Sequence, residues 1–135
     1  MESNVTEFSL EKYNTCAVQK GALKCWGDIP SILSDELNLV SNVELVSAHG
    51  INTCISEKTI FKCLGFNMYG QLGVGTKEPV LKFQKINGLE QEVKQFKISY
   101  RHSCAIQRGA LKCWGDNKYG QLGTSLWKIK ELQKL

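Results

Sequence analysis

HSCAIQRGALKCWGDNKYGQLG, residues 102–123, carries the pattern on which the architecture of this 135-residue chain depends. A near copy, NTCAVQKGALKCWGD, stands at residues 14–28. A shift of 88 residues lays 5–18 over 93–106, and a shift of 50 residues lays 43–56 over the same stretch. In each copy a second cysteine follows the first by nine residues. The chain therefore contains three copies of one unit, which begin near residues 5, 43 and 93.

Each copy has the pattern of short β-strands. A first apolar run is followed by a turn and by two alternating runs, TCAV and ALKCW in the first copy, which flank QKG and predict a tight hairpin. The second copy has Lys58-Thr59 in place of the glycine, so the pattern does not define its turn. A loop containing Tyr-Gly-Gln-Leu-Gly follows, and the second copy adds a fourth apolar run at residues 79–86. Four short strands in about fifty residues are typical of a β-propeller blade.

The unit resembles the repeat of the regulator of chromosome condensation (RCC1-like) β-propellers. The matching motifs are Cys-Trp-Gly-Asp-Asn, Tyr-Gly-Gln-Leu-Gly, His-Ser-Cys-Ala at the second strand and a proline before the outer strand. In that family seven such units usually close a ring. The resemblance implies an all-β partial propeller, a single repeat array over residues 1–135 whose ring is not closed within the chain. Its expected blades are residues 5–42 (shortened), 43–92 (most complete) and 93–135 (truncated outer strand).

The copies depart from the family pattern in three places. In the first copy IPSILSDELN, residues 29–38, stands where Gly-Gln-Leu-Gly is expected. The second copy has Leu64 where the others have Trp26 and Trp114, and the third ends soon after its Gly-Gln-Leu-Gly. Because of these departures, the sequence does not establish outer strands for the first and third blades. Helical periodicity is weak, and only LWKIKELQKL, residues 126–135, is a candidate helix.

The repeated glycines and tryptophans have structural roles in this interpretation. Glycines of the Gly-Gln-Leu-Gly loops suit positive φ angles or close chain approach, and no Gly-Lys-Ser/Thr sequence indicates a phosphate-binding loop. The tryptophans are expected to pack where a strand meets the neighbouring blade, with a binding role as the alternative. The motif comprises Trp26, Gly27, Gly70, Gln71, Leu72, Gly73, Trp114, Gly115, Gly120, Gln121, Leu122 and Gly123.

The six cysteines are predicted to form three disulfides. A two-residue turn at Lys20-Gly21 places Cys16 opposite Cys25 at a non-hydrogen-bonded pair, where Cα atoms approach to about 4.5 Å. That distance is at the short end of disulfide geometry. Buried free thiols remain an alternative, whereas zinc is disfavoured because there is no Cys-x-x-Cys and there are only two histidines. The predicted bridges are Cys16–Cys25, Cys54–Cys63 and Cys104–Cys113.

Charge is distributed unevenly, although the net charge is only +4. Residues 1–42 hold three basic and six acidic residues, residues 43–92 hold five of each, and residues 93–135 hold nine basic and two acidic residues. The simpler interpretation is an uneven solvated surface. The alternative is that the acidic first copy attracts the basic third copy of another chain, so that two chains make a six-bladed ring to which Lys128 and Lys130 contribute.

No catalytic constellation stands out. There is no Ser/His/Asp set, repeated carboxylate pair or metal-ligand motif. His102 aligns with Asn14 and Asn52, and Asp116 aligns with Phe66, which suits turn residues better than catalytic groups. The chain is therefore expected not to be an enzyme and to bind no cofactor or metal.

Three blades do not close a propeller, for which about four to eight are usual. The chain is therefore expected to be a fragment, a subunit or a self-assembling part of a larger ring, with head-to-tail blade packing as the route to a homo-oligomer. Members of the family that it resembles use blade-top loops to grip proteins such as a small GTPase or a secreted enzyme. The expected function is a non-catalytic protein–protein interaction module, whose partner the fold does not identify.

Two other functions are alternatives to protein binding. One is carbohydrate binding, as a repeat-based lectin that uses aromatic residues between blades. The other is nucleic-acid or chromatin binding through the basic third copy, which should depend steeply on salt. Alternation along strands would scatter these charges over two faces. The basic residues are Lys94, Lys97, Arg101, Arg108, Lys112 and Lys118.

The sequence does not decide the cellular compartment of the protein. Paired cysteines favour an oxidising compartment outside the cytosol. Against this, no apolar segment of the kind found in a signal peptide follows the first residues of the sequence. No apolar run approaches the length of a membrane span.

Overall fold

The three cysteine hairpins form as the alternating pattern predicts. The computed structural model describes residues 3–123, and the candidate helix at residues 126–135 and the Lys128 and Lys130 contacts lie outside them. Each hairpin has a two-residue turn, including the one at Lys58-Thr59, which the sequence pattern did not define. The hairpins are β2 (Asn14–Gln19) with β3 (Ala22–Gly27), β5 (Asn52–Glu57) with β6 (Ile60–Gly65), and β9 (His102–Gln107) with β10 (Ala110–Gly115).

A preceding strand completes each hairpin into an antiparallel sheet. These strands are β1 (Val5–Leu10), β4 (Val43–His49) and β8 (Val93–Ile98), and each has a register shift near its start. The second sheet gains a fourth strand, β7 (Val80–Lys85), which coincides with the fourth apolar run. We refer below to β1–β3 as the first sheet, β4–β7 as the second sheet and β8–β10 as the third sheet.

The helix α1 (Ser31–Asn38) corrects the expectation that only the end of the chain could be helical. Pro30 precedes it with an extended backbone, φ −56° and ψ 132°, and a proline lacks the N–H that the start of a helix leaves unpaired. Leu33 and Leu37 lie four residues apart on one face of α1, and both are buried. A stripe of two leucines is too short for periodicity to reveal.

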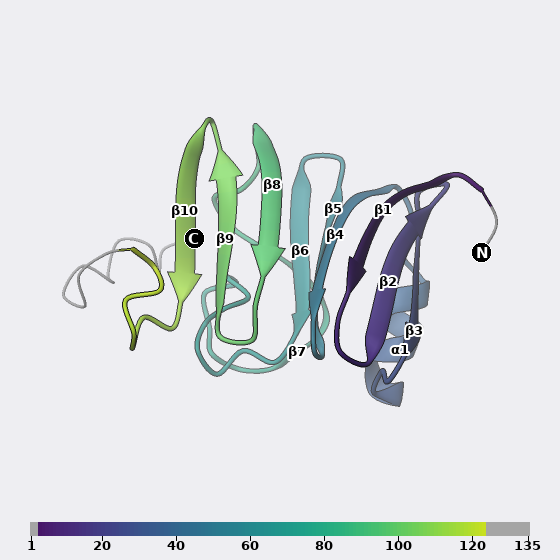
Figure 1. Ribbon diagram of the computed structural model, residues 1–135, viewed down its shortest axis with the longest axis horizontal. Helices are drawn as coiled ribbons and strands as arrows, with labels where there is room; N and C mark the ends of the chain where they lie inside the picture. The colour runs from purple at the N-terminus through teal and green to yellow at the C-terminus, as the bar shows by residue number, and fades with distance from the viewer. Residues whose placement is uncertain (1–2, 124–135) are drawn as a thin grey trace.

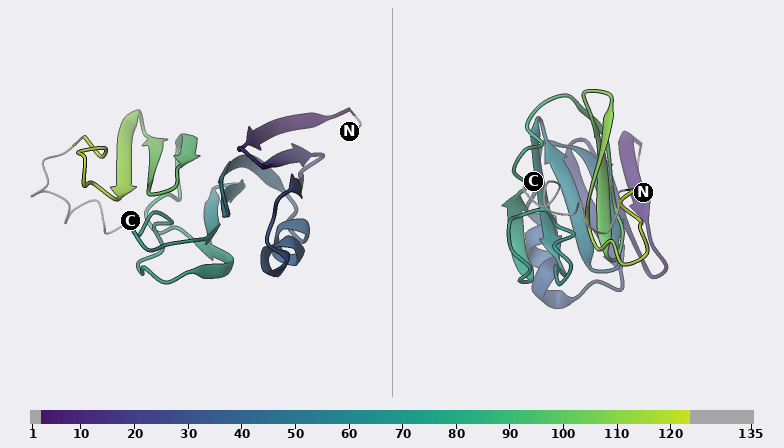
Figure 2. Two further views of the ribbon diagram at one scale, coloured as in Figure 1. Left: turned by 60° about the horizontal axis from the view of Figure 1, so that its bottom comes forward. Right: turned by 90° about the vertical axis from the view of Figure 1, so that its left-hand side faces the viewer.

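The three sheets stand side by side in chain order, with α1 beside the first sheet (Figure 1). Viewed from another side, they follow one another along an arc (Figure 2). The core fills the spaces between neighbouring sheets. Between the second and third sheets the ring of Phe96 lies 5.9 Å from that of Phe61 and 5.8 Å from that of Trp114. The architecture is an all-β partial propeller, and residues 3–123 do not close a ring.

Candidate interaction site at the joint between sheets

The cysteines of each hairpin are joined in the structure. Bonds link Cys16 to Cys25, Cys54 to Cys63 and Cys104 to Cys113, each with a Cα–Cα distance of 4.1 Å. Each pair stands directly opposite in the ladder, as the two-residue turn requires. None of the six is a free thiol in this structure, so they offer neither a nucleophile nor a metal ligand while the bonds are intact.

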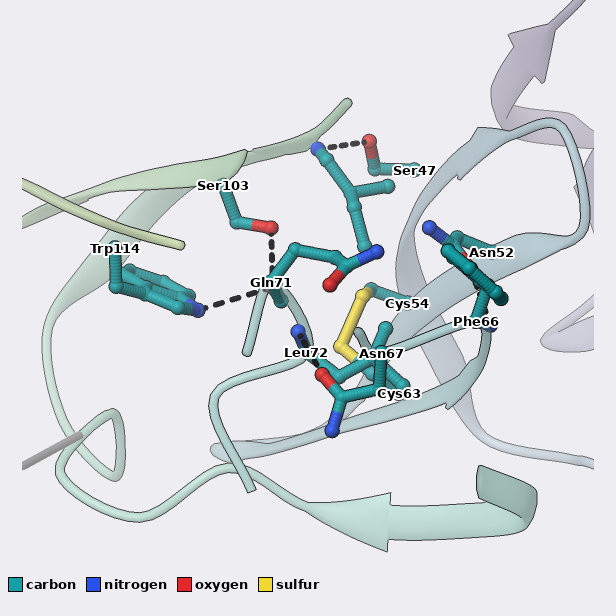
Figure 3. Close-up of a disulfide and its surroundings, with 11 residues drawn as sticks. Ser47, Asn52, Cys54, Cys63, Phe66, Asn67, Gln71, Leu72, Ser103 and Trp114 are labelled. Atoms are coloured by element: carbon teal, nitrogen blue, oxygen red, sulfur yellow. Dashed lines mark hydrogen bonds between the residues drawn. A yellow bond between two sulfur atoms is a disulfide. The ribbon is translucent and has the colours of Figure 1, made fainter. Parts of the chain in front are cut away.

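The contact between the second and third sheets centres on the main-chain oxygen of Gln71. The Ser103 hydroxyl donates to this oxygen at 2.6 Å, and Nε1 of Trp114 donates to it at 3.1 Å (Figure 3). In return, Nε2 of Gln71 donates to the main-chain oxygen of Tyr100 at 3.0 Å. Gln71, Ser103 and Trp114 are all buried. We call this arrangement the Trp–loop joint.

The loop at residues 70–73 has a shape that fits the tryptophan. Leu72 N–H donates to Oδ1 of Asn67 at 3.0 Å, and Tyr69 N–H donates to Oε1 of Gln71 at 3.0 Å, which fixes the loop from within. Gly73 has φ +68°, and a Cβ atom there would lie 2.7 Å from Nε1 of Trp114. Only glycine suits both the left-handed backbone and the closeness of the indole.

The loop at residues 120–123 repeats this shape, and no indole from residues 3–123 lies on it. Leu122 N–H donates to Oδ1 of Asn117 at 3.0 Å, and Tyr119 N–H donates to Oε1 of Gln121 at 2.9 Å. Within residues 3–123 no hydrogen bond reaches the main-chain oxygen of Gln121. A Cβ atom on Gly123 would meet nothing within 4 Å, in contrast to Gly73.

The first and second sheets meet in a different way. Here Leu64 occupies the position of Trp114, and α1 stands where the other copies have a Gly-Gln-Leu-Gly loop. Leu64 is fully buried, and Leu33 and Leu37 of α1 are buried as well. Two departures that look unrelated in the sequence, the missing tryptophan and the missing loop, therefore fall at one joint.

The first sheet exposes three apolar side chains whose counterparts are buried in the third sheet. Phe8, Leu10 and Trp26 have exposed fractions of 59%, 66% and 46%. Their counterparts 88 residues later, Phe96, Ile98 and Trp114, have 6%, 7% and 1%. The expectation that both tryptophans pack against a neighbouring sheet therefore holds for Trp114, whereas Trp26 lies on a free face within the described residues. We call Phe8, Leu10 and Trp26 the apolar face of the first sheet.

Sequence reasoning identified the tryptophans, glycines and glutamines of this site but not their companions. Phe8, Leu10, Thr15 and Ser103 were not singled out as site residues. The available signal was the 88-residue shift itself, because it aligns every residue of the third-sheet contact with a residue of the first sheet.

The six basic residues of the third copy do not form one patch of free charge. Nη1 of Arg101 lies 3.6 Å from Oδ2 of Asp116, and Nε of Arg108 lies 3.9 Å from Oε2 of Glu92. Nζ of Lys112 donates to Oε1 of Gln107 at 2.7 Å. Nζ of Lys118 lies 5.6 Å from the ring centre of Tyr119. The other two, Lys94 and Lys97, are exposed on β8.

The main-chain N–H of Gly88 and then the Lys85 side chain lower the pKa of Glu90, which lies at the surface. Residues 3–123 contain no group of three or more histidine, cysteine or acidic side chains placed to hold a metal ion. They also contain no helix with the length and hydropathy of a membrane span.

Comparison with known proteins gives the family of the repeat. Residues 63–106 match the model of the regulator of chromosome condensation (RCC1) repeat. A search of curated proteins found no match.

Solved structures with the same fold include three from different organisms. Prp20p from Saccharomyces cerevisiae, described with its binding to Gsp1p and histones, has a TM-score of 0.81 and 16% identity over 98% of this chain and 35% of its own. Human WBSCR16 has a TM-score of 0.72 and 17% identity over 93% of this chain and 37% of its own. The CRINKLY WD40 ectodomain of the Arabidopsis thaliana receptor kinase ACR4 has a TM-score of 0.51 and 18% identity over 86% of this chain and 38% of its own.

The chain thus spans little more than a third of each of these structures. The repeat match, the Trp–loop joint and the stacked sheets together agree with the resemblance drawn from the sequence. We conclude that residues 63–106 carry an RCC1 repeat and that the chain has the fold of a partial RCC1-like β-propeller.

Proposed function

We propose that the chain is a non-catalytic protein–protein interaction module of the RCC1-like propeller type. The observation that carries this proposal is the apolar face of the first sheet, where Phe8, Leu10 and Trp26 are exposed together. Contiguous exposed apolar surface marks interaction sites in soluble proteins. Tryptophan is also among the residues that dominate the binding energy of protein interfaces.

Protein binding fits the surface better than the two alternatives do. Nucleic-acid binding rests mainly on free cations that face the phosphates. Four of the six basic residues of the third copy already contact neighbouring side chains. Carbohydrate binding has no supporting feature beyond the aromatic residues themselves. Prp20p, which binds Gsp1p and histones, supports a protein ligand in general, but it does not assign either partner to this chain.

Domain boundaries and compartment are part of the same proposal. We assign the blades to residues 5–42, 43–92 and 93–135 within one repeat array. The protein acts as part of a larger ring, in an oxidising compartment outside the cytosol. Three disulfides support that compartment, because such bonds persist in oxidising surroundings and are rare in the cytosol.

Site-specific photocrosslinking tests the proposal. A photoreactive phenylalanine analogue at Phe8 probes the apolar face, and the same analogue at Ile32, which is exposed on α1, is the matched control. The full chain with its disulfides intact is irradiated in an extract of the cells that produce it. We expect protein adducts at position 8 that are absent at position 32. Equal labelling at both positions, or tight binding of a short DNA duplex with steep salt dependence, would contradict protein binding through this face.

A further inference from the structure

The first and third sheets carry the two separate halves of a Trp–loop joint. The complete joint between the second and third sheets shows how the halves fit together. We call Thr15 and Trp26 of the first sheet the tryptophan half, in which the Trp26 side chain is exposed. We call the loop at residues 120–123 the loop half, on which no indole of the described residues lies. The chain thus contains both the template of a contact and two complementary surfaces that could repeat it.

The tryptophan half is shaped as its counterpart in the complete joint. By the 88-residue shift, Lys12, Thr15 and Trp26 correspond to Tyr100, Ser103 and Trp114. Thr15 stands opposite Trp26 in the ladder, as Ser103 stands opposite Trp114. Threonine keeps the hydroxyl that serine uses as a donor.

The turn before this strand also has the same backbone hydrogen bonds in both copies. Glu11 N–H donates to the Asn14 oxygen at 2.8 Å, and Ser99 N–H donates to the His102 oxygen at 2.9 Å. Asp28 N–H donates to the Tyr13 oxygen at 2.8 Å, and in the third sheet Asp116 N–H donates to the Arg101 oxygen at 2.9 Å. The main-chain oxygen of Lys12 is therefore placed as that of Tyr100, the acceptor for the glutamine side chain.

The loop half is already in the form that receives a tryptophan. Its internal hydrogen bonds match those of residues 70–73 within 0.1 Å. Gly123 has φ +72° against +68° for Gly73. Because the loop has this form without an indole from the described part of the chain, docking would require little rearrangement, which favours binding.

A second copy of this chain is the occupant that fits both halves. The joint between the first and second sheets buries Leu64 and the leucines of α1, so it does not compete for either half. The charges of the two ends are also complementary. Residues 1–42 hold three basic and six acidic residues, whereas residues 93–135 hold nine basic and two acidic residues. Opposite charge speeds encounter and disfavours the wrong orientation.

We propose that Trp26 and Thr15 of one copy dock on the loop at residues 120–123 of a second copy. Nε1 of Trp26 and the Thr15 hydroxyl donate to the main-chain oxygen of Gln121, whose side-chain Nε2 donates to the oxygen of Lys12. This contact is heterologous, so it links chains head to tail. The proposal rests on the proposed function, for which it names a partner.

One feature of the internal joints has no counterpart in this contact. The Ser47 hydroxyl accepts from Ile98 N–H at 3.0 Å, and the Ser9 hydroxyl accepts from Ala48 N–H at 2.9 Å. The third sheet has Lys97 at the corresponding position, which has no acceptor oxygen. The contact between copies therefore forms without this bond and is weaker than the joint within the chain.

Two pairs of variants test the proposal by sedimentation velocity and native mass spectrometry on the oxidised full chain. Trp26→Ala removes the tryptophan half, and Ile32→Ala removes a similarly exposed apolar side chain elsewhere. Gly123→Ala places a methyl group where the indole must lie. Gly120→Ala imposes the same backbone strain, with φ +74°, at a position whose counterpart Gly70 has nothing within 4 Å.

The wild-type chain is expected to form assemblies of at least two 15.2 kDa copies. Trp26→Ala and Gly123→Ala should each raise the dissociation constant at least about 30-fold, while the two controls change it less than about threefold. A wild-type monomer at all concentrations, or assemblies that Trp26→Ala leaves unchanged, would overturn the proposal. A monomer that still gives protein adducts at position 8 would overturn the second copy as partner and leave the proposed function standing.

Discussion

Replacing Gly73 with alanine should cost far more stability than replacing Gly70, although both glycines have nearly the same backbone conformation. Their φ angles are +68° and +70°. A Cβ atom on Gly70 would meet nothing within 4 Å, whereas one on Gly73 would lie 2.7 Å from Nε1 of Trp114 and 3.1 Å from Cγ2 of Ile86. The pair therefore separates the cost of backbone strain from the cost of displacing the tryptophan.

The expected magnitudes follow from these contacts. A left-handed alanine costs about 1–2 kcal/mol, offset by about 0.4–1 kcal/mol because alanine restricts the unfolded chain, so Gly70→Ala should lower the free energy of unfolding by about 1 kcal/mol. Gly73→Ala adds overpacking, about 1–3 kcal/mol, and strains the hydrogen bond from Trp114 to Gln71. Its total should reach about 2–4 kcal/mol.

Urea unfolding followed by far-ultraviolet circular dichroism measures both values under non-reducing conditions. In a Trp114→Ala background most of the extra cost of Gly73→Ala should disappear, because the only tight contact left to the new methyl group is the one at 3.1 Å with Cγ2 of Ile86. Equal costs for Gly70→Ala and Gly73→Ala in the wild-type background would show that the indole does not lie on Gly73. An undiminished extra cost without Trp114 would refute the same reasoning.

Three further outcomes are expected from the same structure. Trp114→Ala should lower the free energy of unfolding by about 3–5 kcal/mol, while Trp26→Ala in a chain kept monomeric by dilution should lower it by less than about 1 kcal/mol, as calorimetry or urea titration would show. Leu37→Ala should cost about 2–5 kcal/mol, because α1 is attached through its buried leucines, and a cost below about 1 kcal/mol would mean that α1 is not packed into the joint between the first and second sheets. Reducing the disulfides, each spanning nine residues, should cost about 2–3 kcal/mol per bond in the chain-entropy model, and an unchanged urea midpoint with reductant would contradict a stabilising role.

Periodicity and spacing were enough to predict the hairpins, because these depend on local sequence. Alternation in TCAV and ALKCW sets which side chains share a face, and the two-residue turn then sets the register that brings Cys16 opposite Cys25. The same logic held for the second copy without a glycine in its turn, since register is also determined by which face is buried.

Contacts between sheets were less accessible to sequence reasoning. Trp26 and Trp114 lie in the same motif, Ala-Leu-Lys-Cys-Trp-Gly, yet one is exposed and the other buried. Their burial depends on what stands against the sheet, which the motif does not encode. The helix α1 was missed for a related reason, because its two leucines are buried only by the first and second sheets, between which the helix packs.

One experiment on mixed variants addresses whether copies of the chain join through the tryptophan and the loop. Trp26→Ala keeps an intact loop half, and Gly123→Ala keeps an intact tryptophan half, so each is expected to be monomeric alone in a native mass spectrum. Mixing them should restore a complex that contains one chain of each kind, twice 15.2 kDa in mass, through the single joint that remains complete. If the mixture stays monomeric while the wild-type chain assembles, the copies associate through another surface and the proposed docking is wrong.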